Sequence, residues 1–490
     1  MPFDFSTVQT SAELQGLSTE LIQSLTTAQI ATLSTDQAGL LTAIQVRAIV
    51  TEDLVAMSTE NISALSTVGV AALTTAQVVA LTSVQIVALT TAQAAALTTA
   101  QVAALTSGQI VSLETQDLTA LTTAQVAALT TAQVVSLTST EVNVLGTSQV
   151  AALTTAQVAA LTSGQIVALT TAQAAALTTA QVAALTSGQI VSLETQDLTA
   201  LTTAQVAALT TAQVASLTST EVNVLGTSQV AALTTAQVAA LTSGQIVALT
   251  SDQAAALTTA QVAALTTGQI NAIVSEDLAA LSTTQVRALT TAQVAALTSG
   301  SIVALTTAQA AAMTTAQVTA LTSGQIVSLE TQDLTALTTA QVAVLTTAQV
   351  RALTTDQIVS LSTVQVPALT TLQVAALTTD QVRSMETQDV AVLTSTQVPA
   401  LSTSAVLALS TAEVAVLTTS AFSSLKTTQL IALSTSQIIA LTTGQFTSLS
   451  TAQMKSLTSA QVLAITSDQQ LSLTSASQWN ALYPASSHRS

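Results

Sequence analysis

The sequence predicts an all-α solenoid of very short helices, with one helix for each eight-residue repeat. Every eighth residue from Leu17 to Leu473 is Leu, Ile or Met, without a slip in register. The residues after each Leu form a helix-capping signature, and the few charges lie at the expected helix ends. The composition agrees, because the 490 residues are 49% hydrophobic but only 1% aromatic and 6% charged. So narrow an alphabet is typical of a repeat array rather than of an ordinary globular domain.

We expect three regions along the chain. Residues 1–16 would form an N-terminal cap or docking segment, residues 17–473 the solenoid of about 57 octads, and residues 474–490 a C-terminal cap or tail. The two terminal segments hold four of the six aromatic residues. Solenoids need end caps because the last repeat exposes its core face, and an end can also dock on a second copy. The candidate self-assembly residues are therefore Phe3, Phe5, Trp479 and Tyr483.

The consensus octad reads Leu-Thr-Thr-Ala-Gln-Val-Ala-Ala, and we number its places from first to eighth. Residues 89–168 match residues 169–248 except at Val135, which corresponds to Ala215. This duplication preserves the phase of the repeat. Whole octads are therefore the structural unit.

A short helix that restarts in every octad fits this consensus best. In a continuous α-helix the Leu place would drift by about 80° per octad, so that no constant face would form. Thr at the second place and Gln at the fifth form a capping box, and the flanking Leu and Val form a hydrophobic staple. We expect each helix to cover the third to eighth places. A β-solenoid is the alternative.

The charges support this register. All acidic residues except Asp4 lie at the second, fourth or fifth place, where a helix N-terminus favours negative charge. Five of the six basic residues inside the array lie at the seventh place, near the helix C-terminus. Pro367 and Pro399 also lie at the seventh place, where a backbone hydrogen bond is lost. We expect those two helices to be frayed or only about one turn long.

No catalytic or cofactor site is predicted. The chain has no Cys, and its lone His488 lies in a Ser-rich tail, so that no triad or thiolate chemistry is suggested. Acidic pairs recur, as in Glu114 with Asp117 and Glu330 with Asp333. Their oxygens are the ligand type that Ca²⁺ prefers, but no Asp-x-Asp-x-Asp-Gly loop accompanies them. We interpret them as helix-capping variants.

The net charge of −17 argues against nucleic acid as a partner. No apolar run approaches the roughly 18 residues of a membrane-spanning helix, and small-molecule ligands are not expected. The first residues have neither a basic nor an apolar stretch, so any export would use a route without a cleavable N-terminal signal.

The sequence Leu-Thr-Thr-Ala-Gln-Val-Ala-Ala-Leu at residues 97–105 resembles the octapeptide arrays of large bacterial surface or secreted proteins. The resemblance covers residues 17–473 and implies an extracellular structural or adhesive role. The same stretch is similar to the first helix of TAL-effector repeats, but their second helix and base-reading loop are missing.

From these observations we expect a non-enzymatic structural protein, extracellular or at the cell surface. Its solenoid would associate with copies of itself into a filament or sheath. The alternatives are a monomeric adhesin or surface stalk, and a scaffold that binds a ligand along its repeats.

Overall fold

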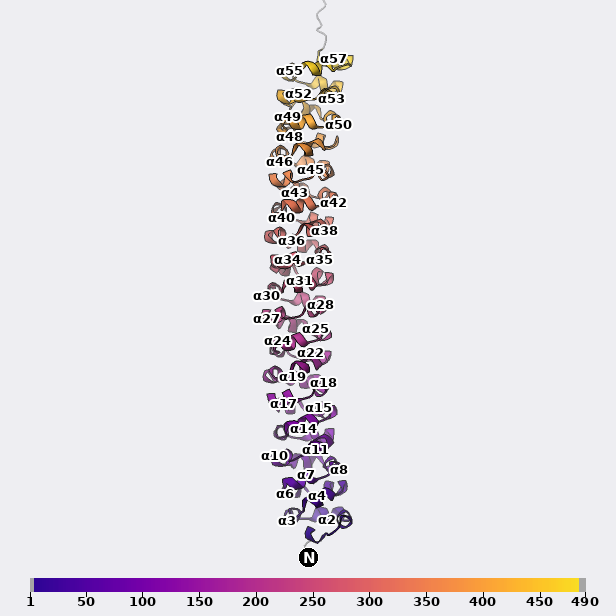
Figure 1. Ribbon diagram of the computed structural model, residues 1–490, viewed down its shortest axis with the longest axis vertical. Coiled ribbons are helices and arrows are strands. Elements are labelled where there is room, and N and C mark those ends of the chain that lie inside the picture. The colour runs from indigo at the N-terminus through magenta and orange to yellow at the C-terminus, as the bar shows by residue number, and fades with distance from the viewer. Residues whose placement is uncertain (1–3, 484–490) are drawn as a thin grey trace, which may run out of the picture. The chain divides into compact units, whose positions relative to one another are not determined.

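The computed structural model describes residues 4–483 and confirms the all-α fold. Within these residues it contains 57 α-helices and three 3-10 helices, and no strand, so the alternative of a β-solenoid is wrong. The chain divides into two compact units, unit 1 (Met1–Ala248) and unit 2 (Leu249–Ser490). In each unit, short helices follow one another and stack in successive turns (Figure 1).

Most helices cover the third to eighth places of their octad, as predicted. Examples are α9 (Thr75–Ala80) and α12 (Thr99–Ala104). The helices that depart from this six-residue span are α1 (Ser11–Gln15), α3 (Thr27–Ile30), α10 (Ser83–Val87), α13 (Ser107–Ile110), α20 (Ser163–Val167), α23 (Ser187–Val191), α27 (Ser219–Asn223), α30 (Ser243–Val247), α37 (Ser299–Val303), α42 (Thr339–Ala343), α44 (Thr355–Val359), α47 (Thr387–Ala391), α50 (Thr419–Ser423), α51 (Thr427–Leu430), α53 (Thr443–Thr447), α55 (Ser459–Leu463), α56 (Ser467–Leu471) and α57 (Ala476–Leu482).

The predicted capping box starts these helices. At α9 the backbone N–H of Gln77 donates to Thr74 Oγ1 at 3.2 Å, and the backbone N–H of Thr74 donates to Gln77 Oε1 at 2.7 Å. The chain then leaves the helix at Leu81, whose backbone is extended at φ −56° and ψ 134°. No residue in the described part of the chain has a positive φ. The turns between helices therefore need no glycine, which explains how an array with so few glycines can change direction after every helix.

The two proline octads form shorter and tighter elements, which confirms the expectation. The octads of Pro367 and Pro399 contain only the 3-10 helices η2 (Val366–Ala368) and η3 (Val398–Ala400). A proline at the seventh place lacks the N–H that the last α-helical hydrogen bond requires.

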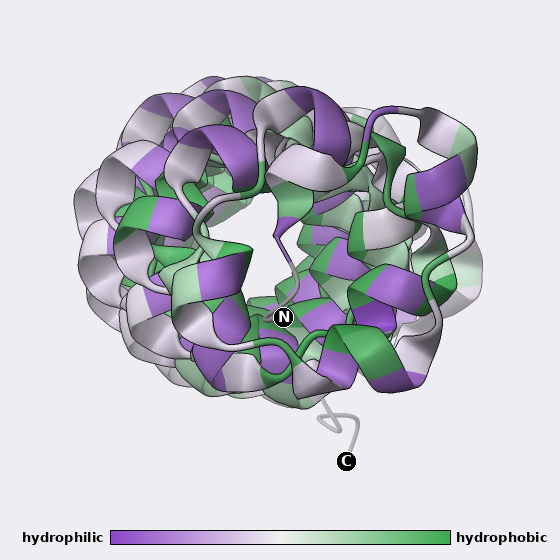
Figure 2. Cartoon of the chain, turned by 90° about the horizontal axis from the view of Figure 1, so that it is seen from below, coloured by the Kyte–Doolittle hydropathy of each residue, from purple (hydrophilic) through white to green (hydrophobic). Residues whose placement is uncertain are grey.

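One turn of the solenoid contains between three and four octads. Helix α12 packs on α9 and on α15 (Thr123–Ala128), three octads before and after it. The side chain of Gln101 reaches further, to the carbonyls of Val70 and Leu73, which lie 31 and 28 residues earlier. Helices that follow one another thus lie side by side around an axis, as the view onto the N-terminal end of unit 1 shows (Figure 2).

Most octads bury three side chains. In the octad of α12 these are Leu97, Gln101 and Val102, whereas the second to fourth places are exposed. The Leu and Val were expected in the interior, and each contributes roughly 1.5–3 kcal/mol on full burial. The burial of the Gln was not expected and is described below.

Residue sizes at the sixth place are matched between successive turns. Every Ala at this place is followed 24 residues later by a Leu or an Ile. The helices that carry the two residues of each pair are packed together, so a large side chain is placed opposite a small one, as close packing requires. The pairs are Ala38 with Ile62, Ala94 with Leu118, Ala174 with Leu198, Ala254 with Leu278, and Ala310 with Leu334.

Candidate functional site

The fifth-place glutamines form a ladder of buried amides, which we call the Gln ladder. Gln181 is 1% exposed, and its Nε2 donates to the carbonyls of Val150 at 2.9 Å and Leu153 at 2.6 Å. Its Oε1 accepts the Thr178 N–H at 2.7 Å. The same side chain thus caps its own helix and binds the end of a helix in the preceding turn. An unpaired buried carbonyl costs about 1–3 kcal/mol, so this amide holds two turns together.

Six octads carry Asp instead of Gln at the fifth place, and we call them the Asp octads: their acids are Asp53, Asp117, Asp197, Asp277, Asp333 and Asp389. The interpretation of their acidic pairs as capping variants is wrong for the Glu side chains. Glu114 occupies the N-cap of α14 (Thr115–Ala120), but its side chain makes no capping hydrogen bond. It accepts instead from the exposed side chain of Gln116. Glu330 of the pair with Asp333 behaves in the same way.

Burial shifts the ionisation of these aspartates. Asp117, Asp333 and Asp389 are each 1% exposed. Loss of solvent around the carboxylate, and then the charge of the Glu three residues earlier, raises the pKa of Asp117 to about 6. A hydrogen bond from the Glu114 backbone acts in the opposite direction. The same two causes raise the pKa of Asp333 and of Asp389 to about 6.

At the N-terminal end, Phe5 lies inside the solenoid. It begins the 3-10 helix η1 (Phe5–Thr7), has 0% exposure, and its carbonyl accepts from Gln37 Nε2 at 2.9 Å. Helix α1 packs on α4 (Thr35–Leu40) beside it. Phe5 therefore closes the first turn of unit 1. The candidate residue Phe3 lies outside the described residues, as does His488.

At the C-terminal end of unit 2, the aromatic pair lies partly in solvent. Trp479 of α57 is 44% exposed, and its ring centroid lies 4.9 Å from that of Tyr483. The preceding helices α55 and α56 expose Leu463 and Leu471 to 87% and 82% at the seventh place. The sixth place of the last full octad holds Gln470 instead of an apolar residue.

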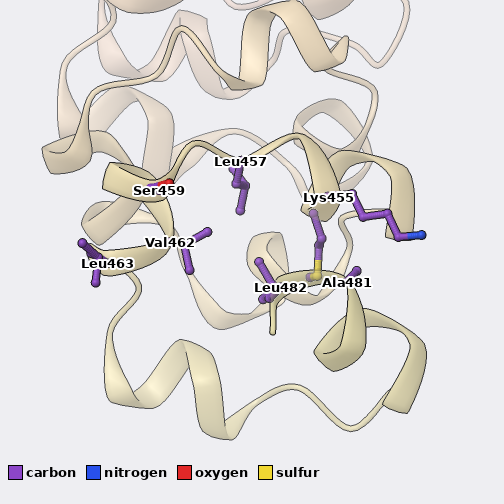
Figure 3. A pocket seen from close by; sticks show the side chains of 8 residues that line it. Lys455, Leu457, Ser459, Val462, Leu463, Ala481 and Leu482 are labelled. Atoms are coloured by element: carbon purple, nitrogen blue, oxygen red, sulfur yellow. The ribbon is translucent and has the colours of Figure 1, made fainter. Parts of the chain in front are cut away.

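A cavity of about 440 Å³ opens beside these residues. Leu457, Val462 and Leu482 point toward it, whereas Lys455 points outward (Figure 3). The two leucines at 463 and 471 were not among the predicted self-assembly residues. The signal that could have found them is the occurrence of Leu, in two consecutive octads, at a place that elsewhere mostly holds Ala or Val. These exposed side chains, the cavity and Trp479 form what we call the C-terminal apolar end.

Residues 4–483 contain no group of three or more His, Cys, Asp or Glu side chains arranged to hold a metal ion. Within the same range, no helix has both the length and the apolar character that crossing a bilayer requires.

The fold and the recurring capping box define an all-α solenoid of octapeptide repeats. The chain belongs to the ALTTAQ repeat family, whose matches tile more than half of it in overlapping segments. The matched residues are 46–83, 80–107, 110–147, 136–163, 143–171, 162–195, 190–227, 216–243, 239–267, 270–307, 300–331, 326–363 and 382–419. A comparison with curated proteins gives no significant match.

Proposed function

We propose that this chain is a non-enzymatic structural protein that assembles head-to-tail with copies of itself into an extracellular filament or sheath. The observation that supports this proposal is the difference between the two ends. The N-terminal turn is closed by Phe5, whereas the C-terminal apolar end exposes Leu463 and Leu471. Covering such side chains releases roughly 25 cal/mol per Å² of apolar surface.

The repeat surface supports a structural role. The exposed second to fourth places are mostly Thr, Ser and Ala, and they present no cluster of nucleophile, base and acid. Two unlike surfaces that meet in a head-to-tail contact produce an open filament when the rotation does not close. An extracellular location agrees with the resemblance to bacterial surface arrays, and fractionation of the source cells with surface labelling tests it.

The experiment is to compare the full chain with Leu463→Glu/Leu471→Glu by negative-stain microscopy and sedimentation. We expect concentration-dependent filaments from the parent chain and their loss in the double variant. The matched control is Val364→Glu/Leu372→Glu, because these two side chains are 67% and 72% exposed away from that end. The control should still assemble.

The opposite outcome also has a defined meaning. If the parent chain gives isolated particles at every concentration, the filament proposal fails and a monomeric surface stalk or a ligand-binding scaffold replaces it. A ligand pull-down with the intact chain would then separate those two alternatives.

A further inference from the structure

The Asp octads interrupt the Gln ladder with a side chain that cannot donate. In the octad after Asp117, Gln125 Nε2 donates to the carbonyls of Ala94 and Leu97 at 2.9 and 2.6 Å. An ionised Asp at the same place has only acceptor oxygens. Among the described residues, buried carboxylate oxygens without any hydrogen-bond partner occur at Asp53, Asp117, Asp197, Asp333 and Asp389.

Asn61 shows what a side chain of this length contacts at the fifth place. Its Nδ2 donates to the Leu33 carbonyl, 28 residues earlier, at 2.7 Å. Asn and Asp have the same length and shape. The corresponding carbonyls for Asp117, Asp333 and Asp389 are those of Leu89, Leu305 and Leu361. An ionised Asp in this position would direct its oxygen at another buried oxygen.

We propose that Asp117, Asp333 and Asp389 are proton-binding joints of the solenoid. As a neutral carboxylic acid, each donates its O–H to the first-place carbonyl of the preceding turn and completes the Gln ladder. When the proton leaves, that hydrogen bond is lost and the two turns are held less tightly. Acidification thus locks these turns, and deprotonation loosens them.

The charges around the three aspartates favour the neutral acid. Each has a Glu three residues earlier on its own element. For Asp117, the neighbouring α11 (Thr91–Ala96) carries no ionisable residue and α17 (Ser139–Val144) carries Glu141. No basic side chain lies on these elements. The pKa of Asp117, raised to about 6, agrees with this environment.

The other two joints have similar surroundings. For Asp333, α38 (Thr307–Ala312) carries no ionisable residue, and α44 carries the exposed Asp356. For Asp389, the packed α49 (Thr411–Val416) carries Glu413. The element three octads before it, η2, has no charged residue. Arg383, on the preceding helix α46 (Thr379–Ser384), forms an ion pair with Asp380 at 2.9 Å.

A metal ion would meet the same oxygens, but the small number of ligands favours the proton. Ca²⁺ takes about six to eight oxygen ligands, and residues 4–483 contain no group of three or more His, Cys, Asp or Glu side chains arranged to hold a metal ion. A proton needs only two oxygens, and it bridges them at a separation such as the 2.7 Å between Asn61 Nδ2 and the Leu33 carbonyl.

The direction of the pH dependence follows from the raised pKa. A group whose pKa is higher in the folded state binds more protons there than in the unfolded chain. Its stabilising contribution is fully present below the unfolded pKa, near 3.8, and is lost as the pH rises through about 6. The folded solenoid should therefore gain stability as the pH falls from neutral through 6.

The test is thermal unfolding of the full chain with EDTA between about pH 7.5 and about pH 5. We expect the parent Tm to rise by a few degrees on acidification. In Asp117→Asn/Asp333→Asn/Asp389→Asn the neutral-pH Tm should already be raised and most of the acid-induced rise lost, because the amides donate at every pH. Burial also raises the pKa of Asp53, Asp197 and Asp277, and these residues account for the part of the rise that remains. The matched control, Asp36→Asn/Asp252→Asn/Asp468→Asn, changes exposed acids that lie on no helix packed against the three joints, and it should keep the rise.

Three outcomes would overturn the proposal. The first is a parent Tm that stays flat or falls between neutral pH and about pH 5. The second is a triple Asn variant that keeps the full rise of the parent. The third is stabilisation by added Ca²⁺ or Mg²⁺ at neutral pH that the triple variant loses, which would assign the joints to a metal. Infrared spectra give an independent readout: a protonated carboxyl band should be present in the parent at mildly acidic pH and reduced in the triple variant.

Discussion

The octads with Gln at the fifth place, here called Gln octads, and the Asp octads differ in the polar side chain that links successive turns. A Gln octad ties two turns together with a neutral amide that both accepts and donates, as Gln181 does. An Asp octad gives up the donor. Asp117, Asp197, Asp277 and Asp333 also share a Leu at the next place and an Ala at the sixth place one turn earlier. In these four octads the size-matched Ala–Leu pair between turns occurs together with the change from Gln to Asp, whereas the octads of Asp53 and Asp389 have the Asp without that pair.

The largest expected change in stability comes from disturbing a size-matched pair of residues in successive turns. Leu334→Ala should destabilise the chain by about 2–5 kcal/mol, because it leaves a cavity against Ala310. The swapped variant Leu334→Ala/Ala310→Leu should recover part of that loss. Chemical denaturation of the full chain measures both, and a coupling of about 0.5–3 kcal/mol is expected.

Leu372→Ala is the matched control for this swap, because Leu372 is 72% exposed. It should change stability by less than about 0.5 kcal/mol. Strictly additive effects of the two core substitutions would show that Ala310 and Leu334 do not share one packing site.

The next effect concerns the Gln ladder itself. Gln181→Met keeps the length and volume of the side chain but leaves the Leu153 carbonyl without its donor, whereas the Val150 carbonyl still accepts the Leu153 N–H. We expect a loss of about 1–3 kcal/mol, the cost of one unpaired buried acceptor. Hydrogen exchange should show that amides in the two turns become less protected. Gln23→Met, at an exposed position, is the control; equal behaviour of the two variants would mean that the ladder contributes nothing.

The sequence predicts the limits of each helix, but it leaves open the contacts between turns that the size-matched pairs and the Gln ladder make. The helix start, span and end are local, because Thr74, Gln77 and Leu81 interact within one octad or its junction. The size of the turn depends instead on contacts 24–31 residues apart. The sequence does contain a trace of the turn size, in size-matched pairs such as Ala94 and Leu118, which lie 24 residues apart. These pairs can be interpreted only when it is known that helices three octads apart are in contact.

The candidate site was predicted less well, for a physical reason. The capping box already accounts for Gln at the fifth place, because its Oε1 accepts the N-cap N–H. The hydrogen bonds that its Nε2 donates to the preceding turn require no further residue, so nothing in the sequence predicts them. The acidic pairs were misinterpreted because Glu114 has the right place for an N-cap, yet its side chain turns to Gln116 on the surface. Trp479 and Tyr483 lie together at the C-terminal end, and their role in assembly remains a prediction.

A smaller effect distinguishes the helix caps of the two kinds of octad. Thr178→Ala removes the acceptor of the Gln181 N–H and should cost about 0.5–2 kcal/mol. Glu114→Ala should cost nothing measurable, because that side chain makes no capping bond. The exposed neighbour in Thr179→Ala is the control. A cost for Glu114→Ala equal to that for Thr178→Ala would contradict the difference between the caps.

The smallest effect concerns the exposed partner of each buried Asp. Glu114, Glu330 and Glu386 raise the pKa of the following Asp through charge repulsion, second to burial. Changing all three to Gln should lower those pKa values. The acid-induced stabilisation would then begin at lower pH, by a few tenths of a pH unit, because solvent screens the exposed charges. Titration of the thermal midpoint, with Glu20→Gln/Glu60→Gln as control, measures the shift. Added salt should move the parent chain in the same direction, since it screens the same repulsion, whereas an unchanged midpoint would assign the raised pKa to burial alone.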